Sequence, residues 1–150
     1  MKKYKFGLQP LLNLKEQTED LLKTKLSHQR KLEREIEQNI SEIELKKAND
    51  IKEFETSLSS TSNFYNVTSF YGYLDSLNKR IKDYELELTK IEYNIRKITK
   101  ELQGASKEKK VLAKLKEKEF EEYKYEVNLE EYNENDQKNS YNYYSDNLNQ

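Results

Sequence analysis

The chain of 150 residues contains no cysteine and no tryptophan, one proline and three glycines. Without cysteine, a disulfide framework, a cysteine-ligated zinc site and a thiol nucleophile are excluded. So few prolines and glycines exclude a collagen-like or proline-rich rod. Hydrophobic residues make up 34% and charged residues 37%, against roughly 45–50% and 25% in an average soluble domain. This profile is typical of a long two-faced helix rather than a globule.

The chain also lacks an excess of one charge and a long hydrophobic run. Its 27 basic and 28 acidic residues give a net charge of −1, so no global field draws it to DNA, RNA or anionic lipid. Gln9, Pro10 and Asn13 interrupt the first leucines, which leaves no apolar core of about 7–15 residues for a signal peptide. No segment approaches the roughly 20 apolar residues of a membrane span. We therefore expect a cytosolic chain.

The second half of the chain has the most regular pattern. Apolar residues recur there at alternating steps of three and four, with charged residues between them. They are Val67, Phe70, Leu74, Leu77, Ile81, Tyr84, Leu88, Ile91, Ile95, Ile98, Leu102 and Ala105. This seven-residue repeat predicts the seam of a coiled coil. Past Gly104 we expect the repeat to be lost and the apolar stripe to be broken.

The first half repeats differently. Its stripe steps by four, four and three, which is closer to an eleven-residue period and predicts a nearly straight helix. The stripe consists of Leu32, Ile36, Ile40, Ile43, Lys47, Ile51, Phe54 and Leu58.

A polar cluster at residues 57–63 separates the two stripes and predicts a loop, because Ser, Thr and Asn compete with the helix for backbone hydrogen bonds. Antiparallel placement about this loop puts Phe54 opposite Phe70 and Leu11 opposite Leu112 in one constant register. The sequence thus predicts an all-α fold, a long two-helix antiparallel coiled-coil hairpin over residues 1–132. Its helices span about 8–58 and 67–132, with a loop at about 59–66. The alternative is pairing between two chains. Residues 133–150 are polar and of low complexity, and we expect a disordered tail.

No constellation for catalysis is visible. His28 is the only histidine, and its polar neighbours indicate a surface residue rather than a metal ligand. Glycine-rich phosphate loops, nucleophile elbows and calcium loops are absent from the sequence. We expect no enzyme activity, no metal and no cofactor.

Two charge runs adjoin each other near the carboxyl end. Residues 107–118 carry a net charge of +4, and residues 119–136 a net charge of −7. Each is either a docking segment for a partner of opposite sign or a solvated helix face. The acidic run argues against nucleic-acid binding by the basic one, because it would repel phosphate within a Debye length of about 8 Å. Tyr71 and Tyr73 fall outside the predicted seam and are candidate binding aromatics.

Several segments resemble the flagellar export protein family FliJ. They are FGLQPLLNLKE at residues 6–16, ED at 19–20, KEKKVL at 107–112, LKEK at 115–118 and EEY at 121–123. The resemblance covers residues 1 to about 137. It implies an antiparallel two-helix coiled coil similar to the gamma-subunit stalk of rotary ATPases, in the cytoplasm at the inner face of the membrane. The implied partners are the hexameric flagellar export ATPase, the membrane-embedded export gate and export chaperones, without nucleic acid or a small-molecule substrate.

The resemblance also assigns candidate contact residues. The ATPase-facing candidates are Phe6, Leu8, Gln9, Leu11, Leu12, Lys107, Lys109, Lys110, Lys114, Lys116 and Lys118. The gate-facing candidates are Asn39, Ile43, Tyr73, Leu77 and Tyr84. Ile43, Leu77 and Tyr84 also belong to the predicted seam, so their alternative role is core packing. The alternative function is a coiled-coil chaperone or tethering factor. We expect the hairpin to be monomeric on its own.

Overall fold

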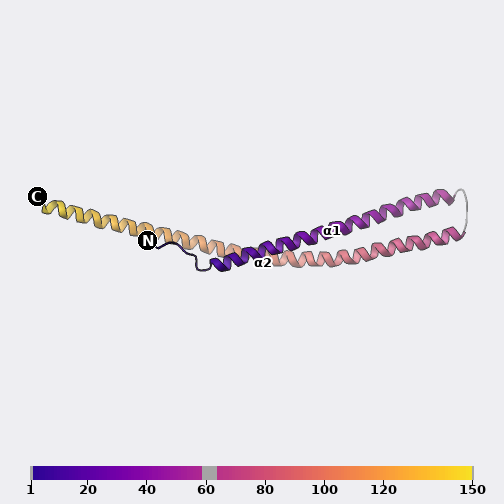
Figure 1. The fold of residues 1–150 in the computed structure, drawn as a ribbon, viewed down its shortest axis with the longest axis horizontal. Helices are drawn as coiled ribbons and strands as arrows, with labels where there is room; N and C mark the ends of the chain where they lie inside the picture. Colours follow the sequence, from indigo (N-terminus) through magenta and orange to yellow (C-terminus); the bar gives the residue numbers. More distant parts are fainter. Residues whose placement is uncertain (1, 59–63, 150) are drawn as a thin grey trace. The chain divides into compact units, whose positions relative to one another are not determined.

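The computed structural model describes residues 2–58 and 64–149, and within these ranges it contains two α-helices and no strand. Helix α1 spans Gln9–Leu58 and helix α2 spans Phe64–Leu148 (Figure 1). Pro10 lies in the first turn of α1, where its missing N–H is not needed. Gly104 lies inside α2, and a Cβ there would meet only open space. The predicted all-α class is confirmed.

The helix bounds agree with the prediction at α1 and differ at α2. Helix α2 already begins at Phe64 and continues to Leu148, through the predicted disordered tail. The tail has neither glycine nor proline, so each residue extends the helix by one hydrogen bond. Nearly all side chains of residues 128–149 are exposed, so packing contributes little to this extension. Most of the predicted loop, residues 59–63, lies outside the described residues.

The chain divides into two compact units. The terminal unit combines Met1–Glu19 with Gly104–Gln150, and the central unit is Asp20–Gln103. Each unit contains one segment of α1 and one of α2.

In the central unit, burial follows a seven-residue repeat on both helices. The buried and half-buried positions of α1 include residues 22, 26, 29, 33, 36, 40, 43, 47, 50 and 54. They step by three and four. The positions of the predicted stripe from Leu32 to Phe54 are buried or half-buried as well, so burial agrees with that stripe along most of its length. Lys47, the one polar member of the predicted stripe, is half-buried, and so are Gln29, Glu33 and Asp50, which that stripe does not include. Leu58, which it included, is exposed.

Polar side chains within this seam are paired across the helices. Lys47 Nζ donates a hydrogen bond to Asn78 Oδ1 at 2.7 Å, and the Tyr73 hydroxyl donates one to Asp50 Oδ2 at 2.6 Å. Beside them, the rings of Phe54 and Phe70 stack with centroids 4.0 Å apart. The residue numbers of these pairs add up to 123–125, which is the constant antiparallel register that the sequence predicts.

One apolar cluster lies in the middle of the central unit. Ile36, Ile91 and Ile95 are buried, and Leu26, Leu32, Ile40, Tyr84 and Leu88 pack against them. Burying each such side chain contributes roughly 1.5–3 kcal/mol. Between these apolar positions, the buried Oε1 atom of Gln29 has no hydrogen-bond partner among the described residues.

In the terminal unit the seam also continues, contrary to the expectation that it is lost past Gly104. Residues 105, 109, 112, 116, 119 and 123 of α2 are all buried or half-buried. The sequence conceals this repeat because Lys109, Lys116 and Glu119 occupy three of its positions. Opposite Leu112, the buried leucine is Leu12 at 4% exposure, whereas Leu11, which the sequence analysis paired with it, is 39% exposed.

Among the described residues, neither helix contains a stretch long and apolar enough to cross a membrane.

Replacing the unpaired seam amide should stabilise the protein. We expect Gln29→Leu to raise the free energy of unfolding by about 1–2 kcal/mol, because it removes a buried acceptor without a partner and adds apolar contact. Urea unfolding followed by circular dichroism measures the change. The matched control is Gln38→Leu, on an exposed position of the same helix, which should change stability little. Equal effects of the two substitutions would contradict this account of the seam.

Candidate partner-binding site

The segment before α1 packs along α2 in the terminal unit. The Gln9 N–H donates a hydrogen bond to the Phe6 carbonyl at 3.0 Å, and the Leu12 N–H donates one to the Leu8 carbonyl at 2.9 Å. The first bond closes a turn, and the residues before it continue along α2 toward its carboxyl end, from Leu112 at Phe6 to Tyr123 at Lys2. The amino-terminal segment therefore lies beside α2 (Figure 1).

An apolar cluster holds this segment in place. Phe6, Leu12 and Leu112 are buried together, and Tyr4 packs against them. The Tyr4 ring lies 5.2 Å from that of Phe120 and 5.5 Å from that of Tyr123, between centroids. Aromatic pairs at such distances add about 0.5–1.5 kcal/mol to the apolar burial.

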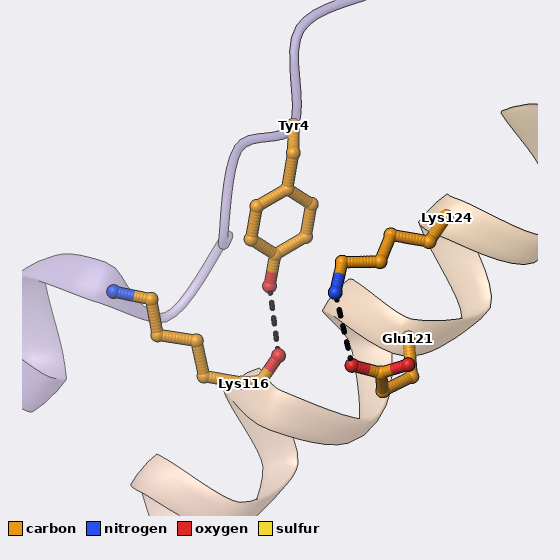
Figure 2. A network of polar contacts seen from close by, with 4 residues as sticks. All are labelled: Tyr4, Lys116, Glu121 and Lys124. Atoms are coloured by element: carbon orange, nitrogen blue, oxygen red, sulfur yellow. Dashed lines mark hydrogen bonds and ion pairs between the residues drawn. The ribbon is translucent and has the colours of Figure 1, made fainter.

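Hydrogen bonds at both ends of the segment reinforce the cluster. The Tyr4 hydroxyl donates to the backbone carbonyl of Lys116 at 3.1 Å (Figure 2). Lys116 Nζ donates to Gln9 Oε1 at 2.7 Å, and the Tyr123 hydroxyl donates to the Lys2 carbonyl at 2.6 Å. Burial, with a smaller contribution from the charge of Glu119, raises the pKa of Tyr4 above its ordinary value. Its hydroxyl therefore remains a hydrogen-bond donor at neutral pH.

Ion pairs continue the seam below the cluster. Lys15 pairs with Glu108, and Glu19 pairs with Lys109 at 3.6 Å. Glu19 is only 6% exposed. A buried carboxylate is tolerated only when cations or hydrogen bonds compensate its lost hydration. Lys109 is therefore engaged within the chain.

The predicted ATPase-facing residues fall into two groups. Phe6 and Leu12 are buried, and Gln9, Lys109 and Lys116 are bonded within the chain. Leu8, Leu11, Lys107, Lys110, Lys114 and Lys118 are exposed.

The four exposed lysines form one row. They step by three, four and four residues along α2, so they share the helix face that is turned away from the seam. Among the described residues none of the four has an ion-pair partner. We call Lys107, Lys110, Lys114 and Lys118 the lysine row.

A shallow groove lies beside the amino-terminal segment. Tyr4, Leu12, Ala113, Lys116, Glu117 and Phe120 line it. Its walls are mostly apolar, because the lysine and glutamate contribute chiefly their aliphatic stems. Tyr4, Phe120 and Tyr123 were not predicted as site residues from the sequence. The only available signal was the spacing of Phe120 and Tyr123 along one helix face.

The predicted gate-facing residues lie in the central unit and are all at least half-buried. Ile43 and Leu77 are core residues, at 7% and 2% exposure. Asn39, Tyr73 and Tyr84 are half-buried. Tyr73, which the sequence analysis placed outside the seam, bonds to Asp50, and this hydrogen bond is the main reason that its pKa is raised. Tyr71 is exposed, as that analysis expects of a residue outside the seam.

His28 is exposed. Among the described residues no three histidine or carboxylate side chains come together in a way that could hold a metal ion.

Removing the anchor of the amino-terminal segment should loosen the terminal unit. We expect Phe6→Ala to cost about 3 kcal/mol, because it leaves a cavity beside Leu12 and Leu112. Backbone amides of residues 2–12 should then exchange with deuterium faster. Leu8→Ala is the matched control, since Leu8 is already 41% exposed. Unchanged exchange in Phe6→Ala would show that the cluster does not hold the segment.

Comparison with known protein families gives one match that covers nearly the whole chain. The model of the family described as flagellar FliJ protein matches residues 4–148. No curated protein and no solved structure gives a significant match. The match includes both helices and the amino-terminal segment from Tyr4 onward. The chain therefore belongs to the flagellar FliJ family, whose members are components of flagellar protein export.

Proposed function

We propose that this chain is a non-enzymatic stalk of the hexameric flagellar export ATPase. In this role it promotes assembly and activity of the hexamer and links it to the export gate and to export chaperones. It acts in the cytoplasm, peripherally at the inner face of the membrane at the flagellar base. Family membership supports the export role, and the terminal unit supports the stalk role.

The lysine row carries the proposal. Lys109 and Lys116 are bonded within the chain, whereas the four lysines of the row are exposed and lack ion-pair partners among the described residues. Unpaired cations on one helix face favour a partner surface of opposite charge and increase the rate of encounter with it. Leu8 and Leu11, both exposed, add apolar contact area in the same unit. The ATPase-facing surface is thus the lysine row with these two leucines.

The proposed gate contact depends on the central unit. Of the five gate-facing candidates, Asn39, Tyr73 and Tyr84 are half-buried and so keep part of their side-chain surface accessible. Ile43 and Leu77, which are buried, contribute by holding the seam that positions the other three. Substitutions of these two residues would therefore act through the fold.

The decisive experiment is the rate of ATP hydrolysis by the purified export ATPase with and without this chain. We expect the wild-type chain to stimulate hydrolysis and ring formation. The variant Lys107→Glu, Lys110→Glu, Lys114→Glu, Lys118→Glu should stimulate roughly tenfold less, because reversed charges repel the acidic partner surface. Lys109 is left unchanged because it pairs with the buried Glu19.

The matched control reverses four exposed cations of α1 in the central unit, Lys25, Lys31, Arg34 and Lys52. It has the same net charge as the test variant and should stimulate like the wild type. Circular dichroism verifies that both variants remain helical. No stimulation by the wild-type chain, or equal loss in both variants, would contradict the stalk role. The chaperone or tether function would then replace it.

A further inference from the structure

Cations cover the outer face of α2 in the central unit. We define this outer face as the positions between residues 79 and 100 that lie farthest from the seam. They are Lys79, Lys82, Asp83, Leu86, Thr89, Lys90, Tyr93, Arg96, Lys97 and Lys100, all exposed. Lys79 pairs with Asp75 at 3.3 Å. The other five cations have no ion-pair partner among the described residues.

The matching face of α1 is different. Between residues 31 and 52 its outer positions carry three cations and two acids, so its charge is nearly balanced. Six cations against one acid on α2 are therefore a local feature rather than a property of the whole coiled coil. Like charges three and four residues apart on a helix destabilise it by about 0.2–0.5 kcal/mol per pair. A partner of opposite charge would relieve this repulsion.

Two apolar side chains lie among these cations. Leu86 is 60% exposed and Tyr93 is 61% exposed. They are seven residues apart, which places them on one line along the helix, two turns from each other. A basic helix face with such a pair fits an acidic helix whose own apolar residues repeat at the same spacing.

The carboxyl-terminal part of α2 is a helix with these properties. We call residues 119–136 the acidic segment, because it has eight acidic residues and one lysine. Tyr125, Leu129 and Tyr132 follow one face of it and are 69%, 47% and 68% exposed. Tyr125 and Tyr132 are seven residues apart, as Leu86 and Tyr93 are.

We propose that the acidic segment of one chain docks on the outer face of α2 in a second copy of this chain. The helices run antiparallel, so that Leu86 lies opposite Tyr132 and Tyr93 opposite Tyr125. This alignment brings opposite charges together in three places, Lys82 with Asp136, Arg96 with Glu122 and Lys97 with Glu121. It has one like-charged pair at its end, Lys100 with Lys118.

The opposite direction fits less well. A parallel alignment with the same apolar pairing has two opposite-charge pairs rather than three, Lys82 with Glu121 and Lys97 with Asp136. It would also place Lys79 opposite Lys118 and Asp83 opposite Glu122. Both of these pairs are repulsive and lie on the outer face, so charge pattern selects the antiparallel direction. The contact does not use the seam, which is closed within one chain. A monomer therefore persists wherever salt screens the outer charges.

This inference does not rest on the proposed stalk function. Its test is the oligomeric state of the full chain by sedimentation velocity over a range of protein concentrations. At about 50 mM salt we expect reversible dimers, and at about 500 mM salt monomers, because the Debye length shortens severalfold. The variant Lys82→Glu, Arg96→Glu, Lys97→Glu should dimerise at least about tenfold more weakly at low salt.

A charge swap makes the test specific. Adding Glu121→Lys, Glu122→Lys and Asp136→Lys to that variant restores all three opposite pairs and should restore dimerisation. The control variant Lys31→Glu, Arg34→Glu, Lys52→Glu changes net charge equally on α1 and should dimerise like the wild type. A chain that is monomeric at every concentration in low salt, or a swap that fails to rescue, overturns the proposal. Monomers that bind vesicles of phosphatidylglycerol and phosphatidylcholine would assign the outer face to a membrane instead.

Discussion

The antiparallel register of the two helices is the constraint on which the other features depend. Apolar residues alone would tolerate a slip of one seven-residue repeat, because leucine and isoleucine are interchangeable as seam contacts. Such a slip moves one helix by about 10 Å along the other. It would separate Lys47 from Asn78 and Asp50 from Tyr73, and it would leave their charges in the seam without partners. Polar residues within a seam thus select one register at some cost in stability.

The same constraint decides which residues are available to partners. Within one short run of lysines, the seven-residue repeat turns Lys109 and Lys116 toward α1 and the segment before it. It turns the four lysines of the lysine row the other way. A basic run that looks uniform in sequence therefore contains two classes of side chain, one structural and one free. The gate-facing candidates divide in the same manner, since Ile43 and Leu77 are core residues.

The parts of the fold that depend on local apolar pattern could be predicted from the sequence. Val67 to Ala105 specify the seam of α2 without ambiguity, and the pairing of Phe54 with Phe70 follows from them. Lys47 was placed in the stripe by its spacing between apolar residues, whereas the seam positions of Glu33, Asp50 and Lys116 were not predicted, because their polar side chains do not continue the apolar pattern. The docking of Tyr4 on Phe120 depends on contacts between residues more than a hundred positions apart. The lysines of the candidate site were identified from the sequence, but not which of them are bonded within the chain and which are exposed.

The carboxyl-terminal end of α2 is helical although it has few packing contacts within the chain. Most of the stability of a helix in a protein comes from tertiary packing, and residues 128–149, which continue α2, have almost no packing partner in the terminal unit. Repulsion among the carboxylates of the acidic segment lowers its stability further, just as repulsion among cations acts on the outer face of α2. Each surface has the charge and the apolar spacing that would relieve the other. One antiparallel contact between two copies would neutralise the acidic segment and the basic outer face together, whereas two unrelated partners would each have to match one of these surfaces.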